Sequence, residues 1–212
     1  MRLRHLSMKL SSLDQLTNKV LNLEQYSTDG NLASQWINDI IEFGDLFSDC
    51  TVCDLGSGNG VLGLGCLLMG ASSATFVEID QKACATIKSN ASKLGVSNNI
   101  SVLNIDVNDL NVENNKFDLI ICNPPWGYQN YKADRKFIHT ILNLNAPTHL
   151  MHSSKSKHFE KLFLESFWTV DKYRNALFSI PAAYEHHKSP NSTTSASIWR
   201  LMPPVRSNTP DR

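Results

Sequence analysis

The stretch TVCDLGSGNG at residues 51–60 decides the fold of this chain. Its first five residues, TVCDL, predict a buried strand, and Gly56, Gly58 and Gly60 follow at once. The next segment, GVLGLGCLLMG at 60–70, predicts a buried helix. A glycine-rich turn between a strand and a helix indicates a ligand site. Missing side chains let a ligand approach the backbone, and the start of a helix offers free N–H groups.

Strands and helices continue to alternate outward from this turn. The patterns predict strands at 74–80, 100–107, 117–123 and 148–153, helices at 81–95, 133–144 and 157–168, and a closing strand pair at 173–180 and 195–202. Such alternation predicts an α/β fold, with a mostly parallel sheet and helices on both faces. With 212 residues in all, we expect a single domain over 1–202 and a disordered, proline-rich tail at 203–212.

The segment before the first strand predicts two helices. Apolar residues at helical spacing indicate an N-terminal amphipathic helix at about 10–23: Leu10, Leu13, Leu16, Val20 and Leu23. Thr28 or Asp29 is expected to cap a second helix that runs to about Phe43. The first residues are basic without a long apolar run, and no stretch is long enough to span a bilayer, so we expect a cytoplasmic protein.

Composition restricts the function. Lys plus Arg and Asp plus Glu both total 20, so the formal net charge is zero. A nucleic-acid substrate would therefore need a local basic patch or a basic partner.

The five cysteines are an odd number, and most lie in apolar runs, which predicts free thiols in a reducing compartment. Cys50 and Cys53 form a lone C-x-x-C without a second pair, so we expect no metal site.

Acidic residues stand at the ends of the first three predicted strands. The turn reads G-x-G-x-G rather than the G-x-G-x-x-G of dinucleotide sites. Asp54 would repel a pyrophosphate, whereas it suits a sulfonium-bearing amino acid. Glu78 is placed to accept the hydroxyls of a ribose. Asp106 could accept from an adenine amine, and the Val107 backbone could donate to a ring nitrogen. Each acid alone is as readily a cap or loop residue, but the three together predict a nucleoside-bearing cofactor, S-adenosylmethionine.

The fourth predicted strand runs into Asn123-Pro124-Pro125-Trp126. Two prolines stop the strand and stiffen the turn. The Asn123 side-chain oxygen and the Pro124 carbonyl could each accept one N–H of an exocyclic amine and direct its lone pair at a methyl donor. Trp126 would stack on the flat face of the base. The segment therefore predicts methylation of an amine on an extruded base.

The chain resembles the methyltransferase-like protein five family, ribosomal RNA adenine methyltransferases of class I that include archaeal relatives. The resemblance is carried by LEQYST (23–28), DLGSGNGVLGLG (54–65), VEID (77–80), IDV (105–107), CNPPWG (122–127), the Asp134 and Phe137 pair, and IPAAYEHHKS (180–189). It implies a Rossmann-like class I methyltransferase fold with a seven-stranded sheet whose last strand is antiparallel. It also implies methylation of an adenine amine in structured RNA, such as small-subunit ribosomal RNA.

The resemblance also implies roles for individual residues. Cofactor contacts fall on Gln25, Thr28, Asp54, Gly56, Gly58, Asn59, Val61, Glu78, Asp106 and Val107. The target adenine would be held by 123–126, with further substrate contacts from Tyr26, Tyr128, His186, His187 and Lys188. Family members often work with a small zinc-binding activator subunit, which would pair with the edge strand at 100–105. Trp126 stands where Phe is usual in the family, which predicts a tighter or differently angled pocket.

Three other functions remain open from the sequence. A protein glutamine-N5 methyltransferase uses the same Asn-Pro-Pro-aromatic chemistry, although LEQYST and the lack of a separate N-terminal helical domain argue against it. A guanine-N2 RNA methyltransferase is a second alternative. A binding module without turnover is a third, and intact Asp54, Glu78 and Asn123 count against it.

Overall fold

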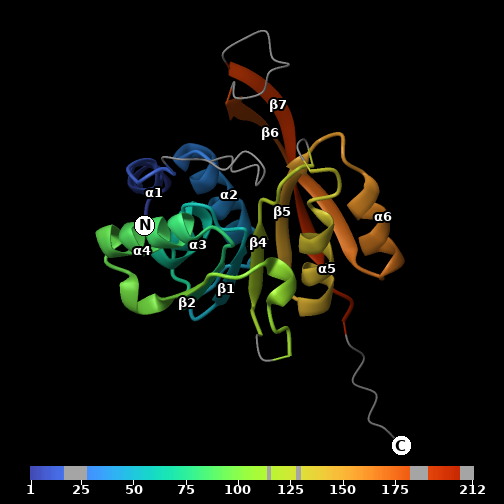
Figure 1. Cartoon of the computed structure of the whole chain (residues 1–212), viewed down its shortest axis with the longest axis horizontal. Helices are drawn as coiled ribbons and strands as arrows, with labels where there is room; N and C mark the ends of the chain where they lie inside the picture. Colours follow the sequence, from blue (N-terminus) through green and yellow to red (C-terminus); the bar gives the residue numbers. More distant parts are fainter. Residues whose placement is uncertain (17–27, 114–115, 128–129, 182–190, 206–212) are drawn as a thin grey trace, which may run out of the picture.

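Seven strands form one sheet in the order β3-β2-β1-β4-β5-β7-β6 (Figure 1). The computed structural model describes residues 1–16, 28–113, 116–127, 130–181 and 191–205. The strands are β1 (Thr51–Leu55), β2 (Ser73–Val77), β3 (Ile100–Leu103), β4 (Leu119–Cys122), β5 (Thr148–Ser153), β6 (Thr169–Pro181) and β7 (Asn191–Met202).

Strands β1 to β5 run parallel to their neighbours, whereas β7 lies antiparallel between β5 and β6. This confirms the predicted mostly parallel sheet with an antiparallel last strand. Leu55 pairs in register with Val77 on one side and with Cys122 on the other, and Val77 pairs with Leu103. The carboxyl ends of four strands therefore lie level with one another, which brings the segments that follow them to one edge of the sheet.

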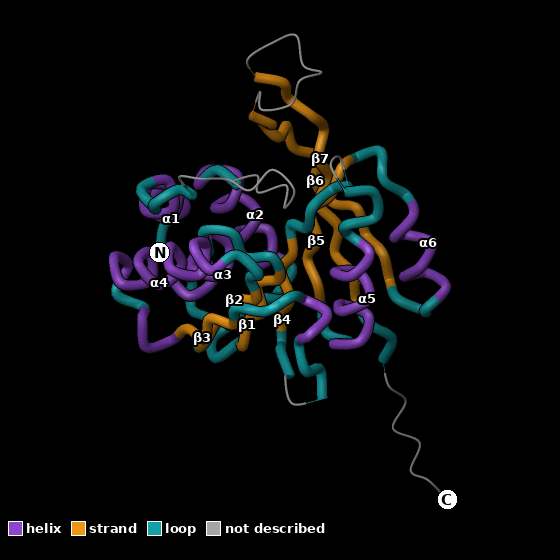
Figure 2. Tube along the Cα trace, viewed as in Figure 1, coloured by secondary structure: helices purple, strands orange, loops and turns teal. Residues whose placement is uncertain are grey.

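Helices cover both faces of the sheet (Figure 2). The core on one face includes residues of α1 (Leu3–Ser11), α2 (Gly30–Glu42), α3 (Val61–Leu68) and α4 (Gln81–Leu94). The core on the other includes residues of α5 (Arg135–Leu144) and α6 (His158–Glu165). Short 3-10 turns lie at Ser97–Asn99 (η2) and Val107–Asp109 (η3).

Strand β4 shows why the apolar runs of the sequence became central strands. Leu119 and Ile121 pack into the core under α1 to α4, while Ile120 and Cys122 pack into the core under α5 and α6. All four side chains are fully buried. Successive side chains of a strand point to opposite faces, so a strand covered on both faces needs apolar residues at every position.

The N-terminal helix differs from its prediction. It spans Leu3–Ser11, not 10–23. Within the described residues the helix ends at a serine pair, where the Ser12 hydroxyl donates to the Lys9 carbonyl at 2.8 Å. The chain then turns so that the Asp14 backbone N–H donates to Asn90 Oδ1 at 2.8 Å. The prediction over 12–16 is therefore wrong because a local hydroxyl bond and a tertiary bond replace helical ones. Residues 17–27 lie outside the described part.

The second predicted helix is confirmed as α2. The Asp29 side chain accepts hydrogen bonds from the backbone N–H groups of Asn31 at 3.0 Å and Leu32 at 2.9 Å, which caps the helix.

After α2, Asp45 joins the loop to the sheet. It accepts from Arg200 Nε at 2.6 Å and lies 2.9 Å from His149 Nε2. These buried charges are paired, as stability requires.

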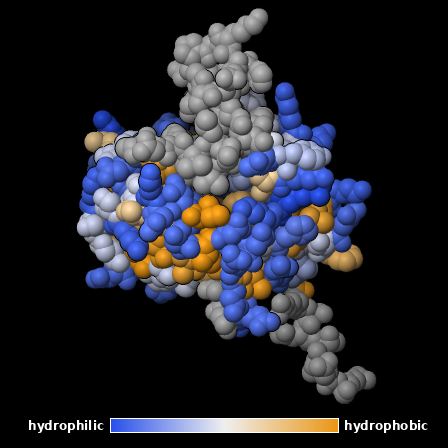
Figure 3. All heavy atoms as spheres, viewed as in Figure 1, coloured by the Kyte–Doolittle hydropathy of each residue, from blue (hydrophilic) through white to orange (hydrophobic). Residues whose placement is uncertain are grey.

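The view in Figure 3 shows a mostly hydrophilic surface, with apolar residues gathered mainly near the middle and below it. All five cysteines are free and buried. Among the described residues, no helix combines the length and apolar character that a membrane span requires.

Candidate active site

The glycine turn after β1 is held in place by backbone hydrogen bonds. The Gly56 N–H donates to the Val77 carbonyl at 2.9 Å, and the Ser57 hydroxyl donates to the Asp54 carbonyl at 2.7 Å. Gly56 has φ +72°, and a Cβ added there would lie 2.9 Å from the Phe137 ring. Glycine is thus needed at this position both for its backbone angle and for the close approach of α5.

Asp54 lies buried at the base of the turn. Its Oδ2 accepts the Gly63 backbone N–H at 2.9 Å from the first turn of α3. Burial raises the pKa of this carboxyl to about 7. The Gly63 hydrogen bond opposes the rise and the charge of Glu78 adds to it. A cationic ligand would be stabilised by this group and would favour its ionised form.

Glu78 follows β2 directly and faces the turn. Its Oε2 accepts the Gly58 N–H at 2.8 Å, and its Oε1 accepts the Asp80 N–H at 2.9 Å. Burial raises the pKa of Glu78, although these two hydrogen bonds lower it in part. Each carboxylate oxygen has a second acceptor site, so the pair can still bind two hydroxyls of one ligand. Asp80 caps α4 by accepting the Lys82 N–H.

Some of the residues that follow β3 line the pocket, and others lie at its rim. Val107 lines the pocket together with Ile105. The Asp106 side chain accepts the Asn108 N–H at 3.0 Å and pairs with Lys136 Nζ at 2.6 Å. Although burial opposes it, these two partners lower the pKa of Asp106. The predicted contact of Asp106 with an adenine amine stays a prediction, and Lys136 competes for its carboxylate.

One pocket joins these groups at the carboxyl edge of the sheet. Its lining includes residues predicted to contact the cofactor. They come from the segment before α2, from β1 and the turn and helix after it, and from the residues that follow β2 and β3: Thr28, Asp54, Gly56, Gly58, Asn59, Val61, Glu78 and Val107. It also includes Asn123 and Pro125 from the turn after β4, and Leu16, Lys136 and Phe137. The turn at 56–60 and the segment at 123–126, 67 residues apart at their first positions, thus face a common cavity.

Asn123 has a fixed amide orientation. Its Nδ2 donates to Thr28 Oγ1 at 3.2 Å, and its Oδ1 accepts from the Trp126 indole Nε1 at 3.3 Å. An amide nitrogen only donates and an amide oxygen only accepts, so these two partners determine which side is the acceptor. An amide oxygen accepts two hydrogen bonds, and Trp126 uses one of them.

The Trp126 indole packs into the protein. It is 8% exposed and stacks on the His152 ring, with centroids 6.0 Å apart and planes at 20°. Pro124 is also buried, whereas Pro125 lines the pocket. The predicted stacking of Trp126 on a target base stays a prediction.

Other predicted site residues lie outside the described residues: Gln25, Tyr26, Tyr128, His186, His187 and Lys188. Sequence reasoning assigned no role to Lys136, which lines the pocket, or to Asn90. The Asn90 side chain donates to the carbonyls of Asp14 at 3.2 Å and Asn59 at 3.0 Å, so it ties the N-terminal segment to the glycine turn. The sequence signal that could have identified Asn90 was an asparagine within the amphipathic segment 81–95, at a position that the structure buries.

A family model described as Conserved hypothetical protein 95 matches residues 35–180. The rRNA N(6)-adenosine-methyltransferase METTL5 of Danio rerio is 26% identical over 207 residues, which cover 96% of this chain and 100% of the relative. This chain belongs to that family, and it is similar over nearly its whole length to methyltransferase-like protein five. It is therefore a class I methyltransferase with S-adenosylmethionine as its cofactor.

Two further comparisons extend over nearly the whole methyltransferase. An uncharacterized protein of Methanocaldococcus jannaschii is 35% identical over 207 residues, covering 93% of each chain. The crystal structure of a candidate RNA methyltransferase from Pyrococcus horikoshii superposes with a TM-score of 0.85 at 28% identity, covering 97% of this chain and 99% of that one.

The pocket suits the chemistry of S-adenosylmethionine. Asp54 is a buried carboxyl that accepts the Gly63 N–H, and among the described residues no Lys, Arg or His pairs with it, although a buried charge usually has a cationic partner. A sulfonium and an ammonium group would supply positive charge there. A Cβ added at Gly58 would meet nothing within 4 Å, so a ligand can approach the turn's backbone at this point. The acceptor pair of Glu78 suits the two hydroxyls of a ribose.

Proposed function

We propose that this methyltransferase transfers a methyl group to the N6 amine of an adenine in structured RNA, small-subunit ribosomal RNA being the best candidate. The observation that carries the proposal is the orientation of Asn123, whose amide oxygen is fixed as an acceptor beside the cofactor pocket. The P. horikoshii neighbour is described as an RNA methyltransferase and the D. rerio relative as an rRNA adenosine methyltransferase, which supports this choice of substrate.

The chain's contribution to the reaction is positioning. When bound, S-adenosylmethionine supplies an electrophilic methyl group on its sulfonium. Asn123 Oδ1 would accept one N–H of the adenine amine, and the Pro124 carbonyl would accept the other. Two acceptors draw the amine towards tetrahedral geometry and direct its lone pair at the methyl carbon. The nitrogen gains the methyl as the carbon–sulfur bond breaks, and it then releases one proton to water. No residue needs to remove that proton beforehand, which suits a neutral Asn.

The donor site and the acceptor site are joined through Thr28. Its hydroxyl accepts from Asn123 Nδ2, and the residue also lines the cofactor pocket. Thr28 is 5% exposed. We propose that it aligns the Asn123 amide with the bound cofactor, so that the two reactants approach at a fixed angle. A misplacement of about 1 Å in such an arrangement can cost roughly a hundredfold in rate.

Methyl transfer from labelled S-adenosylmethionine to separate ribosomal RNA and protein fractions tests the proposal. We expect label in RNA, recovered as N6-methyladenosine after nuclease digestion. Asn123→Ala should retain cofactor affinity by calorimetry and lose turnover. Asn99→Ala, an exposed asparagine at the opposite end of the sheet, is the matched control and should keep full activity. Label in N2-methylguanosine or in methylated glutamine would support one of the two alternative enzymes instead.

We also propose that the edge strand β3 accepts a partner subunit. Ile100–Leu103 pairs with β2 on one side and ends the sheet on the other, within the described residues. An edge strand offers unpaired backbone groups to a strand from another chain. The predicted partner is a small zinc-binding activator. Zinc analysis of the protein purified from its own cells tests this, and a zinc-free monomer would contradict it.

A further inference from the structure

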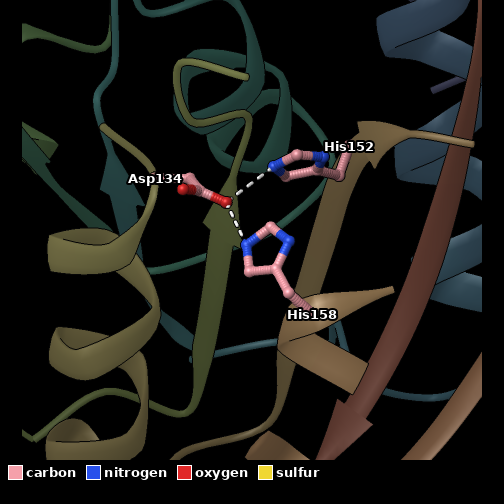
Figure 4. Close-up of side chains that lie close together, drawn as sticks. All are labelled: Asp134, His152 and His158. Atoms are coloured by element: carbon pink, nitrogen blue, oxygen red, sulfur yellow. Dashed lines mark hydrogen bonds and ion pairs between the residues drawn. The ribbon is translucent and has the colours of Figure 1, made fainter. Parts of the chain in front are cut away.

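Three polar side chains that the proposed reaction does not use lie close together: Asp134, His152 and His158 (Figure 4). Asp134 directly precedes α5, His152 lies on β5, and His158 begins α6. Asp134 Oδ2 lies 3.1 Å from His152 Nε2 and 2.6 Å from His158 Nε2. Asp134 and His152 are buried, whereas the His158 side chain is 48% exposed. One carboxylate oxygen thus bridges two imidazoles.

The protonation of His152 is determined by its other nitrogen. The Ser153 backbone N–H donates to His152 Nδ1 at 2.8 Å, so Nδ1 carries the lone pair. In the neutral ring the proton is then on Nε2, which donates to Asp134. Although burial raises the pKa of Asp134, the hydrogen bonds and charges of His152 and His158 bring it below its usual value. The carboxylate is therefore suited to remain an acceptor for both rings.

This arrangement favours a hydrogen-bonded cluster over a metal site. A metal at His152 Nε2 would require the proton on Nδ1, where it would face the Ser153 N–H. Histidines that bind metals usually donate the other ring N–H to an acceptor, not meet a second donor. The 2.6 Å separation of His158 Nε2 from the carboxylate oxygen is also that of a charge-assisted hydrogen bond.

The cluster connects to the catalytic segment through Trp126. The His152 ring contacts both the Trp126 indole, at 6.0 Å and 20°, and the Phe159 ring, at 5.3 Å and 41°. The same indole donates through Nε1 to Asn123 Oδ1. A rotation or shift of the imidazole would therefore move the surface on which the indole rests, and with it the donor that orients the Asn123 amide.

We infer that Asp134 and His152 are positioning residues for methyl transfer: the Asp134 carboxylate holds the His152 ring at the angle that seats Trp126, whose indole N–H orients Asn123. This inference rests on the proposed role of Asn123. It assigns a reason for Trp at position 126, because a phenyl ring could stack on His152 but has no N–H for the amide.

A double-mutant cycle tests the inference. Asp134→Asn keeps the side-chain volume and His152→Phe keeps an aromatic ring at that position, and each should lower kcat roughly tenfold to a hundredfold, in line with the cost of a misplaced reacting group. Cofactor affinity by calorimetry and KM for RNA should stay within about twofold of the wild type, the scatter expected for uncoupled sites. In a Trp126→Phe background, where the indole N–H is already absent, each substitution should lower kcat by no more than about twofold. Equal losses in both backgrounds would overturn the inference.

A spectroscopic readout separates this inference from the choice of substrate. The indole N–H resonance of Trp126, assigned by its absence in Trp126→Phe, is measured without RNA or cofactor. Asp134→Asn should shift it, while His139→Ala, which removes an exposed imidazole from the helix that follows Asp134, should not. An unchanged resonance in Asp134→Asn would refute the positioning role even if the enzyme methylates adenine. A shifted resonance in a protein inactive on RNA would refute only the proposed substrate.

Discussion

The electrostatics of the pocket floor can be tested with Asp54→Asn. Burial raises the pKa of Asp54 from its ordinary value of 3.8 to about 7. This rise corresponds to about 4 kcal/mol of differential interaction between the two protonation states. Between about pH 4 and pH 7 the folded protein keeps a proton that the unfolded chain has released. The free energy of unfolding should therefore fall as pH rises, by about 1.4 kcal/mol per pH unit, and level off above about pH 7.

Urea denaturation of the wild type and Asp54→Asn across about pH 4 to pH 9, which includes this window and the plateau above it, isolates this effect. The Asn side chain can still accept the Gly63 N–H, but it has no charge to desolvate. The variant should therefore gain stability relative to the wild type as pH rises to about 7, because the other titrating groups cancel in the difference. Asp109→Asn, which removes an exposed carboxylate at the end of η3, is the control for the loss of one negative charge.

Cofactor binding gives a second readout of the same group. A cationic ligand binds the ionised carboxylate better, so wild-type affinity for S-adenosylmethionine should rise with pH up to about 7, and the variant should lack this rise. A stability difference that stays flat from about pH 5 to pH 9 would refute the reasoning, because it would mean that Asp54 ionises in the folded protein as it does in the unfolded chain.

Three further outcomes are expected. Glu78→Gln should weaken S-adenosylmethionine binding by about tenfold in calorimetry, the worth of a charge-assisted hydrogen bond; unchanged affinity would place the ribose contact elsewhere. Gly56→Ala should lower the free energy of unfolding by about 2–3 kcal/mol, because the added Cβ is strained and meets Phe137. Gly44→Ala has a similar φ and no neighbour, so its cost should be about 1 kcal/mol, and equal costs would contradict the contact. Asp45 has a pKa lowered to about 2, because its hydrogen bonds outweigh the raising effect of burial. It should thus contribute about 2 kcal/mol above pH 4 that is lost as pH falls towards 2, and Asp45→Asn should lack this acid step in urea denaturation.

The sequence predicted the sheet well because its strands are short apolar runs that need burial on both faces. Glycines at 56–60 and acidic residues at strand ends also predicted a ligand site, because few other roles explain why such residues recur at one edge of a sheet. The pocket lining agrees for Thr28, Asn59, Glu78 and Val107. Their individual contacts with the cofactor remain predictions.

Other features could not be read from local patterns. Leucine spacing fits a helix equally well at 3–11 and at 10–23, and the boundary depends on serine hydroxyls and on a tertiary bond to Asn90. His152 lies in an apolar strand, where a core residue and a hydrogen-bonded positioning residue look alike. Asp134 and Phe137 were noted as a pair, but only the fold brings Asp134 to two imidazoles and Phe137 to Gly56.

Mass spectrometry of ribosomal RNA nucleosides from cells that lack this protein tests the central claim most directly. The cells would be complemented with the wild type or with Asn123→Ala. We predict that one N6-methyladenosine is lost in the deletion strain, returns with the wild type, and does not return with Asn123→Ala. An unchanged level of N6-methyladenosine in the deletion strain would contradict the claim.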